Sequence, residues 1–146
     1  MMPLQNSATL VAIKPQSVTS GATATGVIDR LGFEEAAIDV ILDSQASTTS
    51  NPSVLKLQQS DITDATGYAD ISGFIGDATA GGFVIPPAGA AATIVRLNVD
   101  CRSRKRYLKV IVSPDGATQL LAAVATLGKA KTSTVARSAM SGVVDG

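Results

Sequence analysis

The sequence contains no histidine and only one cysteine, Cys101. Histidine is the commonest general base and metal ligand, so its absence argues against most hydrolytic and metal-dependent enzymes. One cysteine permits neither an internal disulfide nor a site built from several thiolates. The many serines also lack a histidine to activate them. We therefore predict no catalytic residue, metal or cofactor. Cys101 is predicted to be a semi-buried thiol, although the neighbouring Arg102 could lower its pKa.

Aromatic residues are scarce as well, with three phenylalanines, two tyrosines and no tryptophan in 146 residues. The core must therefore be built from valine, isoleucine, leucine and alanine, which bury less area per residue than aromatic rings. A chain of this length suits one domain. Because a thin aliphatic core gains from contacts between subunits, we predict a homo-oligomer, with a homotrimer preferred over a dimer.

Motifs for nucleotides and membranes are also missing. Gly21 and Gly26 have the spacing of a phosphate loop, but Val27 and Ile28 stand where lysine and serine or threonine are required. The longest uncharged run, residues 78–95, is interrupted by three glycines and two prolines, so it does not predict a membrane-spanning helix. The first residues lack the features of a signal peptide, and we expect a soluble, non-secreted chain.

The carboxylates do not form a recognisable catalytic pattern. Asp61 and Asp64 follow a predicted strand, where aspartate commonly accepts hydrogen bonds from nearby backbone N–H groups. We assign both residues this turn role, ahead of calcium binding or catalysis.

The net charge is zero, but the charges are unevenly distributed along the chain. Residues 1–80 contain three basic and nine acidic residues, whereas residues 81–146 contain nine basic and three acidic ones. Four of the basic residues form a short run: Arg102, Arg104, Lys105 and Arg106. Such asymmetry is found in ordinary surface charge, in contacts between subunits and in nucleic-acid binding.

Short apolar segments separated by turn residues predict an all-β chain. The predicted strands are residues 10–13, 27–30, 33–43, 54–59, 93–100, 107–113 and 119–127. Within 33–43 the first residues have helical propensity, but Ile38, Val40 and Leu42 follow the alternation of a strand. The alanines of 119–127 permit a helix or a strand. The turn residues before that segment favour an antiparallel strand.

Seven or eight such segments predict an antiparallel β-sandwich or barrel in a single domain, residues 1–146. We place the β core at about residues 27–128, between an extended N-terminal arm, 1–16, and an extended C-terminal arm, 129–146. Residues 44–53 are predicted to be a polar loop. Residues 68–92 are predicted to be a long connection that either has a function of its own or contacts a partner.

The basic run joins two predicted strands, 93–100 and 107–113, which together predict a hairpin with positive charge at its tip or along one edge. The run is then either a solvated tip or a contact with a partner or second subunit. Nucleic-acid binding is less favoured, because Tyr107 is the only ring nearby and the chain is neutral.

Four short motifs resemble small structural proteins of tailed bacteriophages, a group that includes capsid cement (decoration) proteins. In order they are Leu31-Gly-Phe-Glu-Glu-Ala-Ala-Ile-Asp-Val-Ile-Leu, Leu55-Lys-Leu-Gln-Gln-Ser-Asp-Ile-Thr-Asp, Arg104-Lys-Arg-Tyr-Leu-Lys-Val and the alanine-rich segment before Leu127-Gly128-Lys129. The resemblance spans residues 27–130.

This resemblance implies a jelly-roll-like β-sandwich that acts as a non-enzymatic virion protein. Such a protein would be made in the host bacterial cytoplasm. It would then bind the major capsid protein on the capsid surface as a homo-oligomer and stabilise contacts between capsid subunits. A position at the head–tail connection, or elsewhere in the virion, is the near alternative. From other classes, the alternatives are a nucleic-acid-binding β module that uses the 102–106 run and, more distantly, a carbohydrate-binding sandwich.

Overall fold

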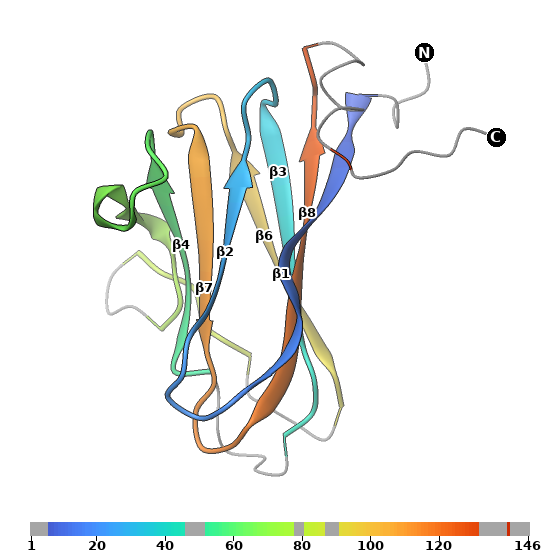
Figure 1. Cartoon of the computed structure of the whole chain (residues 1–146), viewed down its shortest axis with the longest axis vertical. Helices are drawn as coiled ribbons and strands as arrows, with labels where there is room; N and C mark the ends of the chain where they lie inside the picture. Colours follow the sequence, from blue (N-terminus) through green and yellow to red (C-terminus); the bar gives the residue numbers. More distant parts are fainter. Residues whose placement is uncertain (1–5, 46–51, 78–80, 87–90, 132–139, 141–146) are drawn as a thin grey trace, which may run out of the picture.

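The fold is a sandwich of two four-stranded antiparallel β-sheets (Figure 1). The computed structural model describes residues 6–45, 52–77, 81–86, 91–131 and 140. The strands are β1 (Ala8–Val18), β2 (Ala24–Asp29), β3 (Glu35–Leu42), β4 (Val54–Ser60), β5 (Ala69–Ile75), β6 (Thr93–Asp100), β7 (Tyr107–Ser113) and β8 (Gln119–Gly128). No α-helix occurs in these ranges, so the predicted all-β sandwich is confirmed.

The order of the strands is that of a jelly roll. Sheet A has the order β1-β8-β3-β6 and sheet B the order β2-β7-β4-β5. The chain changes sheet after nearly every strand, and β4 and β5 are the one consecutive pair that are hydrogen-bonded neighbours. This confirms the jelly-roll-like sandwich.

The core is built from the inward-facing residues of both sheets, which alternate with exposed ones along most strands. On β8, alanines face inward and lie opposite larger residues of β3. Ala125 is opposite Ile38, and Ala123 is opposite Val40. These four side chains are fully buried. The segment 119–127 is therefore a strand, as favoured from the sequence, and its inward-facing alanines pack in the core beside larger residues of β3.

The predicted hairpin of 93–100 and 107–113 is wrong in its pairing. Both segments are strands, but β6 pairs with β3 in sheet A, whereas β7 lies between β2 and β4 in sheet B. Packed sheets are roughly 10 Å apart, and the connection at residues 101–106 is long enough to cross that distance. Closeness in sequence therefore did not decide the pairing.

The predicted N-terminal arm is also wrong over most of its length. Residues 8–16 belong to β1, which pairs with β8, so the β core begins at Ala8 rather than near residue 27. The polar side chains between Lys14 and Ser17 hid this strand, because an edge strand can be held by backbone hydrogen bonds alone. Residues 1–5 lie outside the described part.

The start of the predicted C-terminal arm is bonded to the core. Ala130 donates a backbone hydrogen bond to Asn6 (3.0 Å), and Lys131 donates one to Gly32 (3.0 Å). Met140 packs against the core. The other residues from 132 to 146 lie outside the described part, so the arm there stays a prediction.

The long connection predicted for 68–92 contains a strand that the sequence analysis missed. β5 pairs with β4 through a register shift, and this irregular edge position gives it only a weak alternating pattern. Beyond it, Ile85 is completely buried, and its N–H donates to the Asp77 carboxylate (2.9 Å). No helix in the described ranges is long and apolar enough to cross a membrane.

Candidate functional site: the charged end of the sandwich

The basic run lies at one end of the sandwich, beside the connections β2–β3 and β4–β5 (upper part of Figure 1). Hydrogen bonds link the basic run to these two connections. The backbone N–H of Arg30 donates to the carbonyl of Arg106 (3.1 Å), and the N–H of Lys105 donates to the Gln59 side chain (3.2 Å). Charges from three distant segments therefore meet at this end.

Three of the four predicted contact residues form ion pairs within the chain. The pairs are Arg102 with Asp100 (2.6 Å), Lys105 with Asp61 (3.7 Å) and Arg106 with Asp29 (2.7 Å). Arg106 also stacks over the ring of Tyr107, with its guanidinium carbon 4.9 Å from the ring centre. Because all three pairs are exposed to solvent, each contributes little stability, but together they neutralise three of the four positive charges of the basic run.

The fourth residue, Arg104, is different. It forms no ion pair with the described residues, and its Nε is buried without a described partner. The carbonyls of Arg104 and Lys105 accept hydrogen bonds from the Arg30 guanidinium. Arg30 thus clamps the connection from the end of β2. The sequence analysis missed this role, since Arg30 is 74 and 75 residues from its partners.

The arginines keep the nearby carboxylates charged. Hydrogen bonds from Arg106 lower the pKa of Asp29, and those from Arg102 hold the pKa of Asp100 far below its usual range. Both carboxyl groups therefore stay charged at a lower pH than an unpaired aspartate does. Asp64 accepts a hydrogen bond from the N–H of Thr66 (3.2 Å), which confirms its predicted turn role.

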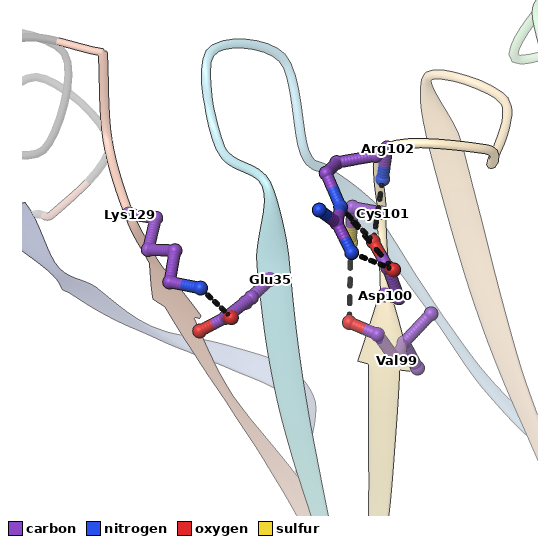
Figure 2. A network of polar contacts seen from close by, with 6 residues as sticks. All are labelled: Glu35, Val99, Asp100, Cys101, Arg102 and Lys129. Atoms are coloured by element: carbon purple, nitrogen blue, oxygen red, sulfur yellow. Dashed lines mark hydrogen bonds and ion pairs between the residues drawn. The ribbon is translucent and has the colours of Figure 1, made fainter.

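A hollow of about 470 Å³ lies on the outer face of sheet A at the same end. Small residues such as Ala37, Thr126 and Gly128 line it, together with Glu35, Ala36, Asn98, Val99, Asp100 and Arg102. Figure 2 shows its two charged sides, the Glu35–Lys129 pair and the Asp100–Arg102 pair. All four charges are already paired. The described residues contain no group of three or more potential metal ligands.

No protein-family model matches the chain, and no curated protein is significantly similar to it. Its function must therefore be argued from its own surfaces.

Cys101 is fully buried rather than semi-buried as predicted. It sits where β6 leaves sheet A, and desolvation raises its pKa to about 11. The arginines that lower this pKa are Arg30 and Arg104 rather than Arg102, and burial outweighs both. A thiol that stays protonated and inaccessible is not a nucleophile.

Burial of Cys101 predicts a loss of stability at alkaline pH. The folded state holds the thiol proton more tightly than the unfolded chain, so stability is complete below pH 9 and declines as pH rises toward about 11. We expect this group to lower the free energy of unfolding by about 2 to 3 kcal/mol, measured by urea unfolding at pH 8 and pH 11. Cys101→Ala is the control, because it keeps all other titrating groups. An equal alkaline loss in both proteins would contradict the prediction.

Proposed function

We propose that this protein is a non-enzymatic structural protein of a bacteriophage virion, a cement protein that binds the capsid surface as a homo-oligomer. The observation that supports this best is a broad apolar surface on the outer face of sheet A. Soluble monomers rarely expose large apolar patches, so an exposed apolar patch commonly marks a surface that binds another protein.

This surface, the outer apolar row, consists of Val11, Ile41, Ile94 and Leu120, which are 64%, 37%, 64% and 55% exposed. The strand register brings them together. Ile41 lies opposite Ile94 on one side and opposite Ala122, two residues from Leu120, on the other. Val11 lies opposite Val124 of the same strand, β8. Four strands therefore contribute apolar side chains to this face, which also carries the Asp39–Arg96 ion pair.

A sandwich with an apolar outer face can stabilise a capsid by binding to its subunits. When the face binds across a joint between capsid subunits, it adds buried apolar area at about 25 cal/mol per Å², and opening the joint must expose that area again. The protein needs no chemistry for this role. The jelly-roll order agrees with the resemblance to phage structural proteins, although a fold by itself does not assign a function.

The ion pairs count against a nucleic-acid-binding module. Arg102, Lys105 and Arg106 would have to leave Asp100, Asp61 and Asp29 before they could neutralise phosphates. The carboxylates that remain would then repel the nucleic acid. A head–tail position in the virion would use the same apolar surface and is the near alternative.

The test is co-sedimentation with empty, expanded capsids of the virus that encodes the chain. We expect the protein to sediment with the capsids and Leu120→Asp to bind at least tenfold more weakly, since burying an unpaired charge is highly unfavourable. Val27→Asp is the matched control, because Val27 is 49% exposed on β2 of sheet B. It should bind like the unmodified protein.

Two results would overturn the proposal. One is that the folded protein fails to bind capsids at all. The other is tight binding to duplex DNA at physiological salt that weakens steeply as salt is added and disappears in the Arg104→Ala, Arg106→Ala double variant. The second result would establish the nucleic-acid-binding alternative.

A further inference from the structure

The four edge strands of the sandwich, β1, β2, β5 and β6, differ in how well they are protected against pairing with a strand of another molecule. β1 carries two register shifts, around Ala12 and around Lys14 and Pro15. β2 is a shorter strand of six residues that contains a glycine, Gly26, and its inner face lies so close to β1 that a Cβ on Gly26 would overlap the backbone of Ala12. β5 is interrupted by a register shift. Bulges, proline and lysine are the usual devices that prevent edge-to-edge pairing.

β6 has none of these devices. It pairs with β3 over all eight residues without a register shift and contains no proline, glycine or lysine. No described strand pairs with its other side. A regular edge strand of this length is a template for another strand.

The hydrogen-bonding groups along this edge can be assigned. Cys101 donates its N–H to the carbonyl of Glu34, which makes 101 and 34 a hydrogen-bonded pair. In an antiparallel ladder such pairs alternate, so the odd-numbered residues of β6 bond to β3. The even-numbered ones direct their N–H and C=O groups toward the free edge: Ile94, Arg96, Asn98 and Asp100.

We infer that the partner of this edge is β6 of a second copy of the chain, paired antiparallel about a two-fold axis. The inference rests on the homo-oligomer of the proposed function and specifies its interface. A trimer joined by strand edges would need a second regular edge on each subunit, whereas β1 and β5 carry register shifts and β2 is shorter and contains a glycine. The edges therefore favour a dimer over the trimer expected from the sequence.

The charges on β6 select the register of this pairing. With Asn98 on the axis, Arg96 of each subunit lies opposite the partner's Asp100, and opposite charges directly across a strand pair are favourable. Moving the axis to Arg96 would place two arginines opposite each other, which is unfavourable. β6 is thus complementary to itself in the register centred on Asn98.

Intrachain ion pairs extend this complementarity. Arg96 binds Asp39 (2.6 Å) on one side of the interface, and Asp100 binds Arg102 (2.6 Å). In the dimer these charges line up in the order Asp39, Arg96, the partner's Asp100 and the partner's Arg102. The signs alternate along the whole row, and the two-fold axis repeats it. The Asp39–Arg96 pair was not predicted from the sequence.

The test is a cysteine placed on the axis. In a hydrogen-bonded antiparallel pair the Cα atoms are about 5.5 Å apart, a separation that a disulfide can bridge. Asn98→Cys should therefore form a covalent dimer under mild oxidation, read on a non-reducing gel. The native Cys101 is buried and should not interfere. Val11→Cys, an exposed cysteine on the opposite edge of sheet A, is the matched control and should stay reduced.

Charge reversal provides the second measurement, by sedimentation equilibrium at micromolar concentration. Arg96→Glu should weaken the dimer on the order of tenfold, because the two copies of the new glutamate face the partner's Asp100. Adding Asp100→Arg should restore most of the affinity. A monomer, crosslinking at Val11→Cys but not at Asn98→Cys, or a trimer unaffected by charge reversal would each overturn this interface. Capsid binding is measured separately, so a monomer that still sediments with capsids would leave the proposed function intact.

Discussion

Replacing Gly26 with alanine is expected to destabilise the protein by more than about 3 kcal/mol, a large fraction of the stability of a typical domain. The new Cβ would overlap the carbonyl oxygen and carbon of Ala12. The obstacle is backbone, held in β1 by its pairing with β8, so it cannot rotate away as a side chain would. Gly26 is therefore required by the close approach of β1 and β2, and its spacing from Gly21 has no part in phosphate binding.

The matched control for this substitution is Gly73→Ala, also in a strand, where nothing lies within 4 Å of the new methyl group. We expect Gly73→Ala to change the free energy of unfolding by less than about 1 kcal/mol. Urea unfolding followed by circular dichroism measures both variants. Similar stabilities for the two would show that β1 and β2 are not in the contact described.

Replacing Leu57 with alanine is expected to lower the free energy of unfolding by about 2 to 5 kcal/mol. Leu57 is completely buried on β4 and lies opposite Val110 of β7. The size of the loss within this range measures how far the surrounding core can collapse into the cavity.

Leu120→Ala removes the same atoms from a side chain that is 55% exposed on β8, and it should lower stability by less than about 1 kcal/mol. The free energies of unfolding of Leu57→Ala and Leu120→Ala are compared by thermal and urea unfolding at the same protein concentration. Equal losses would mean that the outer face of sheet A is as buried as the core.

Local patterns predicted most of the strands correctly. Ile38, Val40 and Leu42 alternate in the sequence and are buried on the same side of β3. The pattern works because successive side chains of a strand point to opposite faces, so a sheet with one buried face leaves a period of two in the sequence. Edge strands leave a weaker signal. β5 and most of β1 were missed because register shifts interrupt their alternation, although both strands bury apolar side chains such as Ile13 and Ile71 in the core.

The candidate site was predicted in part. The basic run does lie at the surface, and the sequence placed its members together. It did not show that Asp29 and Asp61 neutralise Arg106 and Lys105, because these partners come from other connections of the chain. The same is true of Ile41 and Ile94, whose shared apolar surface depends on the pairing of β3 with β6.

By itself, the sequence determined that the chain is a β protein with an aliphatic core and that it has no histidine-based chemistry. Composition and alternation act locally, so both can be read from neighbouring residues. The tertiary structure alone decided that β6 and β7 lie in different sheets, that three of the four charges of the basic run are paired and that one edge remains regular and open. These features depend on contacts between residues far apart in the chain. The energies of such contacts come from packing and pairing across the whole sandwich, and no short segment encodes them.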